Sequence, residues 1–245
     1  MRIELQAAWV LHTRPYRDTS LIADVFTRDH GRLSVIAKGV RSAKSGKSQK
    51  NNQRQRLNPF IPVLLSCQGR NELKTLTSIE THGQAHYLTG RVLFSALYVN
   101  ELLVRLLPVM DTHPGVFDDY QQVLKELNQC DQHDEVDENH LLEVILRRFE
   151  FRFLDQMGYG VNFLSEGDTG NRIDPVEHYY FYPDRGFVRG DESGFLGADL
   201  LSLGAESYDS PQLRRSAKMI TRSALNVLLG GKALKSRELF QQVTR

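Results

Sequence analysis

Residues 6–37, QAAWVLHTRPYRDTSLIADVFTRDHGRLSVIA, carry the pattern that decides the fold. Short runs of β-branched and alternating apolar residues are interrupted there by an Arg-Pro pair and by an Asp-His-Gly triplet. Runs of this length between turn-forming residues are typical of β-strands. The pattern predicts strands at 6–12, 21–27 and 33–37.

Two further runs, at 60–67 and 73–80, extend this β-rich region to residue 80. Five short strands in so short a segment match a small closed barrel, and the OB-fold is the five-stranded barrel that binds single-stranded nucleic acids. An SH3-like barrel or an open sheet would give much the same pattern. The strand pattern alone therefore leaves these three alternatives open.

From residue 84 the apolar residues recur at the three- and four-residue spacing of amphipathic helices. Pro108 and the glycines at 158 and 160 mark helix ends. A last short helix is expected to be capped by Ser236 and to carry Glu238 in its first turn. The longer helices are predicted at 85–107, 116–128, 138–157 and 211–229.

The expected fold class is mixed α and β. An OB-like five-stranded β-barrel over residues 1–80 would bind nucleic acid, and an α-helical domain over residues 81–245 would follow it. Within that domain, about 158–197 is rich in Gly, Asp and aromatics. We expect an irregular insert there, with a hairpin around 179–188.

Composition excludes several classes of protein. The formal net charge is only +1, and the two cysteines, Cys67 and Cys130, lie far apart. A structural zinc site needs about four suitably spaced ligands, so no metal is expected. The chain has no apolar run of about 18 residues for a membrane span and no signal-peptide cleavage site. We therefore expect a cytoplasmic protein with no membrane partner.

Catalytic machinery is not visible in the sequence. Gly46-Lys47-Ser48 has the end of a phosphate-binding P-loop, but Arg41 stands where the first glycine belongs. The chain has no nucleophile elbow, no HExxH and no GxGxxG after a strand. We expect no enzyme activity and no cofactor.

The strongest local charge lies at 38–56, KGVRSAKSGKSQKNNQRQR, which contains no Asp or Glu. With Val40 as its one larger apolar residue, this tract is expected to be a solvated, mobile loop. Five of its charges engaged on a single strand would give a log–log salt slope of roughly −3.5. A solubilising insertion is the alternative. The predicted DNA-binding residues here are Lys38, Arg41, Lys44, Lys47, Lys50, Arg54 and Arg56.

Aromatic side chains in the strand region are candidate stacking platforms for bases. Trp9 and Phe26 lie inside strand patterns, so we expect them in the core. Tyr16 stands in a turn beside Arg14 and Arg17 and is the expected surface aromatic. Phe60 is the fourth aromatic of this group.

A second basic surface is predicted near the C-terminus. Three of its cations are spaced four residues apart on one helix, with no carboxylate on that helix to pair them. Such a row favours an external anion, although an ordinary charged helix face is the alternative. The predicted DNA-binding residues are Arg214, Arg215, Lys218, Arg222, Lys232, Lys235 and Arg237.

The helix predicted at 138–157 carries two adjacent arginines. Arg147 has acids three and four residues away, whereas Arg148 has only apolar residues and an arginine at those positions. A cation with apolar neighbours suits a carboxylate that is followed or preceded by an apolar group. Pairing with a distant part of the fold is the alternative. The predicted peptide-binding residues are Arg147, Arg148, Val144 and Phe151.

These features in this order resemble the RecO family of bacterial recombination mediators across nearly the whole chain. The segments that carry the resemblance are WVLHTRPYRDTSLIADVFTRDHGRLSVIAKGVR, LYVNELLVRLL, LRRFEFRFLDQMGYGVNF and GGKALKSRELF. The resemblance implies an N-terminal OB-fold, a helical C-terminal domain and no nuclease or ATPase activity.

The resemblance also implies partners. It suggests binding of single- and double-stranded DNA, annealing of complementary strands, and cooperation with RecR and single-strand-binding protein to load recombinase in the RecF pathway near the nucleoid. It places the contact with the acidic C-terminal tail of single-strand-binding protein near Arg147 and Arg148. A four-cysteine zinc motif of many members is missing at 165–175. A non-catalytic protein-interaction adaptor whose basic loop does not bind DNA is the alternative function.

Overall fold

The computed structural model describes residues 1–41, 48–130 and 135–243. It divides into two compact units, one formed by Met1–Asp131 with Leu234–Arg245 and the other by Gln132–Ala233. This division differs from the one predicted at residue 80, which followed the change from strands to helices. The first unit also contains helices, because they pack on the barrel.

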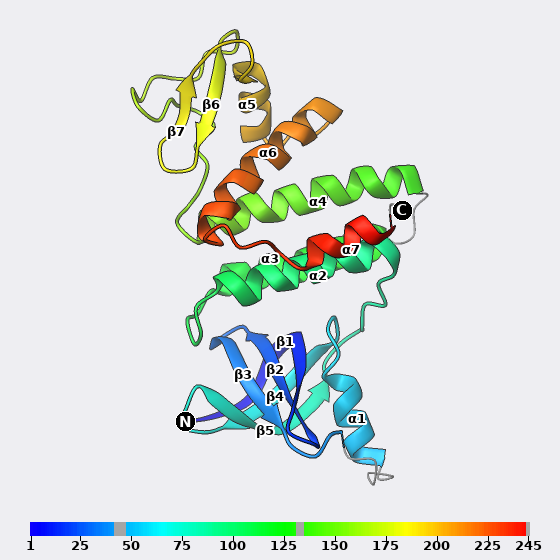
Figure 1. The fold of residues 1–245 in the computed structure, drawn as a ribbon. Helices are drawn as coiled ribbons and strands as arrows, with labels where there is room; N and C mark the ends of the chain where they lie inside the picture. Colours follow the sequence, from blue (N-terminus) through cyan, green and yellow to red (C-terminus); the bar gives the residue numbers. More distant parts are fainter. Residues whose placement is uncertain (42–47, 131–134, 244–245) are drawn as a thin grey trace. The chain divides into compact units, whose positions relative to one another are not determined.

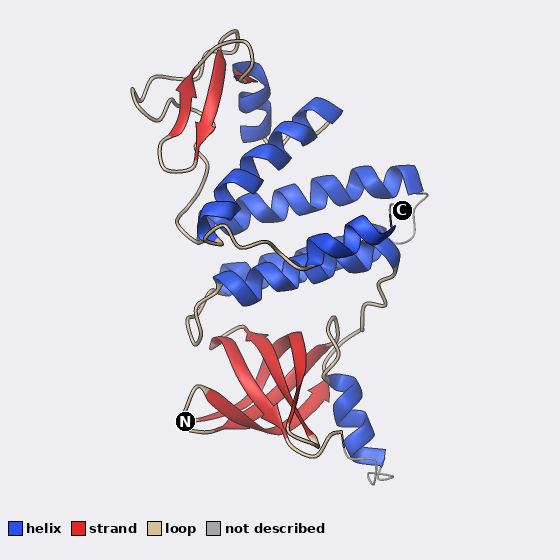
Figure 2. Ribbon diagram, in the orientation of Figure 1, coloured by secondary structure: helices blue, strands red, loops and turns tan. Residues whose placement is uncertain are grey.

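Five strands form a closed barrel in the order β1-β2-β3-β5-β4 (Figures 1 and 2). Neighbouring strands are antiparallel except β3 and β5, which are parallel. A helix, α1 (Ser48–Arg56), lies between β3 and β4 in the chain. This is OB-fold connectivity, so the SH3-like and open-sheet alternatives are wrong. The strands are β1 (Arg2–Tyr16), β2 (Ser20–Thr27), β3 (Gly31–Ala37), β4 (Pro62–Gln68) and β5 (Leu73–Thr81).

The expectation of a loop throughout 38–56 was wrong for its second half, which is α1. Gln and Arg have good helix propensity, and Arg54 and Arg56 in the last turn complement the helix dipole. Leu57, the next residue, is buried in the barrel core. This anchor lies just outside the polar tract, which is why the tract by itself did not indicate a helix.

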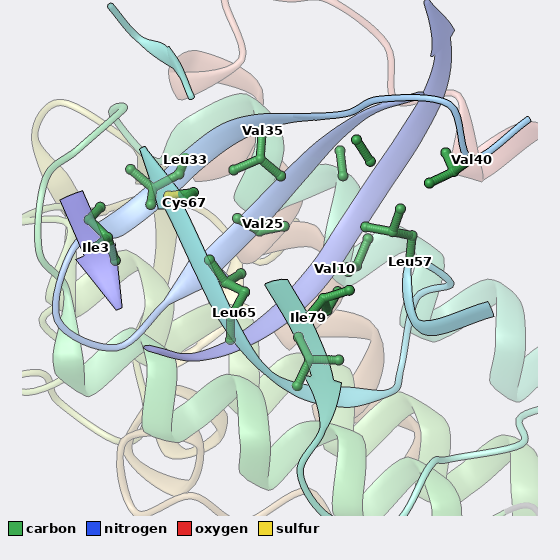
Figure 3. Packing of buried hydrophobic residues seen from close by; sticks show 14 residues of the cluster. Ile3, Val10, Val25, Leu33, Val35, Val40, Leu57, Leu65, Cys67 and Ile79 are labelled. Atoms are coloured by element: carbon green, nitrogen blue, oxygen red, sulfur yellow. The ribbon is translucent and has the colours of Figure 1, made fainter. Parts of the chain in front are cut away.

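Alternate residues of the strands fill the barrel interior (Figure 3). Val10, Val25 and Val35 are completely buried there. Val40 and Leu57, from either side of the 42–47 gap, pack into the same cluster. The segments before and after the gap are therefore both fixed to the barrel.

The outer face of β1 and β2 is covered by α2 (Gly90–Leu106) and α3 (Pro114–Cys130). The ring of Tyr120 on α3 lies 5.9 Å from the ring of Trp9 and 6.3 Å from that of Phe26. Trp9 and Phe26 are only 4% and 0% exposed, so their expected core position is confirmed.

A buried hydrogen-bonded chain fixes both helices to the barrel. Tyr120 Oη donates to Asn100 Oδ1 at 2.6 Å, and Asn100 Nδ2 donates to the carbonyl oxygen of Leu11 at 2.9 Å. Burial raises the pKa of Tyr120, so its hydroxyl stays a donor. The chain satisfies polar groups that would be costly to bury alone.

The end of the β2–β3 hairpin meets the segment that follows α2. Met110 N donates to the carbonyl oxygen of Arg32, and Arg32 Nε donates to that of Leu107. Gly31 has a φ of +63°, and a Cβ there would lie 1.8 Å from the carbonyl oxygen of Asp111. Only glycine fits this close approach of two backbones.

The second unit is built on α4 (Glu135–Gln156), α5 (Gly197–Gly204) and α6 (Pro211–Leu228). The expected hairpin is confirmed as β6 (His178–Tyr182) and β7 (Gly186–Arg189), which β8 (Phe195–Leu196) joins. The pattern did not predict α5, which begins inside the segment expected to be irregular. Tyr179, Phe187 and Leu200 are buried in a core of their own.

Ion pairs connect the turns of this insert. Arg189 contacts Glu166 at 3.4 Å and Glu177 at 3.3 Å, and Arg185 pairs with Asp168. Within the described residues, no three His, Cys, Asp or Glu side chains lie close enough together to hold a metal ion. In that same part of the chain, no helix has the length and apolar character needed to cross a membrane.

The C-terminal helix α7 (Ser236–Val243) packs against α2 in the first unit (Figure 1). Its N-terminus is held by a carboxylate from α2. Glu101 accepts hydrogen bonds from Lys235 N at 2.9 Å, Ser236 N at 2.8 Å and Ser236 Oγ at 2.7 Å. The Ser236 hydroxyl thus donates to Glu101, and Ser236 is the first residue of α7.

Burial alone would raise the pKa of Glu101, but the hydrogen bonds from Ser236 and Lys235 outweigh it and lower that pKa. A carboxylate with a lowered folded-state pKa stabilises the fold above its unfolded-state pKa, about 4.3. This contribution is lost as the pH falls through the folded-state pKa.

We predict that Glu101→Gln lowers the free energy of unfolding at pH 7 by about 1–2 kcal/mol, because the bonds to a charged acceptor weaken. The difference from the wild type should shrink as the pH is lowered below about 4. Urea unfolding between pH 7 and pH 3 measures the difference in free energy. The control is Glu80→Gln, which removes an exposed acid of β5. A difference that stays constant with pH would contradict the role of the charge.

Candidate nucleic-acid and peptide interfaces

The register of β1, β2 and β3 brings three chain segments to one end of the barrel. Leu21 of β2 pairs with Pro15 of β1 on one side and with Ala37 of β3 on the other. The β1–β2 turn begins just beyond this row, and so does the segment 38–41. Basic residues from two separate segments therefore lie at the same end of the barrel.

Arg41 connects the segment 38–41 to the β1–β2 turn by hydrogen bonds. Its backbone N–H donates to the carbonyl oxygen of Thr19 at 2.8 Å, and its Nη1 donates to that of Arg17 at 3.2 Å. Arg41 remains exposed. The cations at this end of the barrel are thus held on a fixed backbone up to residue 41.

The predicted cations of 38–56 differ in their surroundings. Lys38, Arg41 and Arg54 are exposed, and none forms an ion pair within the described part of the chain. Arg56 Nη1 donates to the carbonyl oxygen of Ile79 at 2.8 Å, so its guanidinium fixes α1 to β5. Outside the described residues lie Lys44, Lys47 and the side chain of Lys50.

Two cations outside the predicted set stand at the same end. Arg14 and Arg17 are exposed, and Arg17 lies over the ring of the partly exposed Tyr16, with its Cζ 5.3 Å from the ring centroid. The Arg-Pro-Tyr-Arg sequence in a turn was the available signal. Of the four candidate aromatics, Trp9, Phe26 and Phe60 are buried, so Tyr16 alone can meet a ligand.

The cations of the row predicted on α6 differ in their surroundings. Arg214 pairs with Glu143 of α4 at 3.2 Å, and its Nη1 donates to the carbonyl oxygen of Tyr208 at 2.9 Å. The acid that pairs with Arg214 comes from another helix, so the sequence of α6 alone could not show it. Arg215, Lys218 and Arg222 are exposed and are three and four residues apart, so they share one face of α6.

The remaining C-terminal cations do not form one group. Lys232 and Lys235 are exposed, and Arg237 is half-buried. Lys232 belongs to the second unit, whereas Lys235 and Arg237 belong to the first. Their DNA-binding role stays a prediction for each residue separately.

The two adjacent arginines of α4 have different roles. Arg147 is buried and contacts Glu150 at 2.6 Å, with side chains 9% and 1% exposed. Its expected local pairing is confirmed. A buried arginine held by a buried acid supports the fold and does not present its charge to a peptide.

Arg148 is more exposed, and its partner comes from a distant segment. Its Nε lies 3.5 Å from Glu206 Oε2, and Arg152 Nη2 approaches the same oxygen at 3.3 Å. Glu206 is itself 53% exposed and has a φ of +55°. Arg148 therefore pairs with a distant part of the fold, which was the alternative to a free peptide-binding arginine, and its role in binding a peptide stays a prediction.

The apolar residues predicted beside Arg148 point to the core. Val144 and Phe151 are partly buried and pack against the cluster of the second unit, and the Phe151 ring lies 5.3 Å from that of Phe163. Tyr208, near Arg148, is also buried, and this burial raises its pKa to about 12. Arg148 thus lies at the edge of the apolar core of the second unit.

The barrel connectivity and the exposed cations at one end of the barrel define an OB-fold protein with a basic barrel end. The family described as "Recombination protein O N terminal" matches residues 1–85, and "Recombination protein O C terminal" matches residues 88–238. The chain belongs to the recombination protein O family, RecO.

Curated relatives agree over nearly full length. A protein named DNA repair protein RecO from Photobacterium profundum is 41% identical over 98% of this chain and 97% of its own length. Proteins of the same name from Vibrio vulnificus and Cellvibrio japonicus are 43% and 41% identical, over 98% of this chain and 93% and 98% of their own lengths.

We predict that Arg147→Ala destabilises the protein by about 3–5 kcal/mol, because it leaves the Glu150 carboxylate buried without its ion-pair partner. Arg148→Ala should cost about 1 kcal/mol or less, because that ion pair is partly solvated. Urea unfolding of both variants measures the difference. Equal stabilities of the two variants would contradict the assignment of separate roles.

Proposed function

We propose that this protein is a non-catalytic DNA-binding recombination mediator that acts in DNA repair. In this role it binds single- and double-stranded DNA, anneals complementary strands coated with single-strand-binding protein, and helps to load recombinase in the RecF pathway. The observation that carries the proposal is the cluster of exposed cations at one end of an OB barrel. Family membership supports the same conclusion. The proposed location of this DNA-repair activity is the cytoplasm, at the nucleoid.

Annealing requires that two strands be held at once. Lys38, Arg41 and Arg54 in the first unit supply one set of phosphate contacts, and the exposed face of α6 in the second unit supplies another. Such contacts act through charge and read no sequence. Complementary strands of any sequence then meet the same surfaces, as annealing demands.

Contacts with other proteins belong to the same role. RecR and single-strand-binding protein are the proposed partners. The tail of the latter ends in a carboxylate next to a phenylalanine, which suits Arg148 and Arg152 at the margin of the apolar core. Glu206 occupies both arginines in the free protein, so the tail has to displace its carboxylate.

We predict that Lys38→Ala with Arg54→Ala weakens single-stranded DNA binding severalfold at moderate salt. Loss of two phosphate contacts should also reduce the log–log salt slope by about 1.4. Fluorescence anisotropy across a salt series measures both quantities. The matched control is Lys125→Ala with Arg172→Ala, two exposed cations that belong to neither predicted set.

Unchanged affinity of the first double variant would refute the role of Lys38 and Arg54 in DNA binding. No affinity of the wild-type protein for oligonucleotides would instead favour the protein-interaction adaptor.

For the tail contact, we predict that Arg148→Ala weakens binding of a peptide with the tail sequence and leaves binding of naked DNA intact. Glu206→Gln should strengthen peptide binding about fivefold, because a competing surface ion pair is worth about 1 kcal/mol. Isothermal titration calorimetry with the peptide measures both effects. Glu192→Gln removes an exposed acid of the same unit and serves as control. Equal loss of peptide and DNA binding in Arg148→Ala would exclude this site.

A further inference from the structure

The outer face of β1 presents Tyr16 at the end of the barrel where the cations gather. Ala23 and Leu21 of β2 face the barrel core, and their partners on β1 are Thr13 and Pro15. Because side chains alternate along a strand, Arg14 and Tyr16 lie on the opposite, outer face. They are two residues apart, about 7 Å along the strand.

The neighbours of Tyr16 on the outer face are a small residue and an aliphatic pair, and Ser20 and Ile22 among them are buried. Its partner across the strand pair is Ser20, a small residue, and the next pair along the same face is Arg14 with Ile22. Ile22 pairs in turn with Ile36 of β3. An aromatic ring therefore stands beside a small polar residue and an aliphatic pair, with cations on either side.

Arg17 and Tyr16 are held in place by the turn. Arg17 has a φ of +50°, which is uncommon for a residue other than glycine, and its carbonyl oxygen accepts from Arg41 Nη1. Its guanidinium lies over the Tyr16 ring at a cation–π distance, 5.3 Å. The platform is thus formed before any ligand binds.

A second arginine–tyrosine cation–π pair in the structure serves as a comparison, because its arginine also has an ion-pair partner. Arg185 lies 5.3 Å from the ring centroid of Tyr182, but its guanidinium is also bound to Asp168. Arg17 has no ion pair within the described part of the chain. Its charge is therefore available to a ligand, whereas that of Arg185 is already neutralised.

We propose that Tyr16 and Arg17 form a stacking site for one unpaired nucleobase, with Arg14, Lys38 and Arg41 around it to hold the adjacent phosphates. This inference rests on the proposed function and names the part of the nucleic acid that the barrel end reads. A base inside a duplex is already stacked on both faces, so the site selects single strands. The cations alone would not make that distinction.

Loss of the ring should cost single-strand affinity without changing its salt dependence. Stacking of one base is worth about 1–3 kcal/mol, which corresponds to a loss of about fivefold to a hundredfold in Tyr16→Ala. The log–log salt slope should stay that of the wild type, because no charge is removed. Tyr16→Phe and Tyr16→Trp should retain affinity, and binding of a duplex should change little.

The experiment is a titration of fluorescent oligothymidine and of a matched duplex with each variant over a salt series. Tyr16→Leu, which keeps bulk but no aromatic face, repeats the test should Tyr16→Ala fold poorly. Tyr182→Ala removes the ring of the second cation–π pair and is the matched control. Its affinity should equal that of the wild type.

Single-strand affinity of Tyr16→Ala or Tyr16→Leu equal to that of the wild type would overturn the inference, and so would an equal loss for single strand and duplex. Either result leaves the proposed function standing if the wild-type protein binds DNA. Failure of the wild-type protein to bind oligothymidine at all is a different outcome, because it refutes the proposed function itself.

Discussion

The short parallel pairing between β3 and β5 is the constraint on which the first unit depends. Ser34, Val35 and Ile36 pair with Leu73, Lys74 and Thr75, and this ladder closes the barrel. Closure leaves no open edge and fixes which residues of each strand face inward. The inward set then makes the core, and the outward set becomes available to helices or to ligands. The registers of β1, β2 and β3 within the closed barrel then set where the candidate site residues lie.

The outward-facing residues of β1 and β2 form two groups, one covered by helices and one left uncovered. Toward one end, Trp9 and Phe26 are covered by α2 and α3, and the hydrogen-bonded chain through Asn100 fixes this cover. Toward the other end, Arg14 and Tyr16 remain outside the core. The cover therefore shortens the part of this outer face that is left for a ligand, and the exposed Arg14 belongs to the remaining part.

Ion pairing within the protein decides which cations are available to bind a ligand. The net charge of +1 hides the fact that Arg147 and Arg214 are paired with Glu150 and Glu143, whereas Lys38, on the surface, has no ion pair within the described residues. Between these extremes, Glu206 holds Arg148 by a long, partly solvated contact. Such a contact is weak enough to be exchanged for another carboxylate. Availability, more than the number of positive charges, thus separates candidate binding residues from structural ones.

Local pattern by itself determined the strands, the main helices and the core positions of Trp9 and Phe26, because alternation and helical spacing report which side chains must leave water. Sequence resemblance indicated the family. Only the tertiary structure decided the OB connectivity, the partners of Arg148 and Arg214, and the meeting of Tyr16 with Lys38 and Arg41 at one barrel end. α1 was missed because its anchor, Leu57, lies beyond the polar tract. The physical reason is the same in each case: a pairing between residues far apart in sequence leaves no periodic trace in either segment.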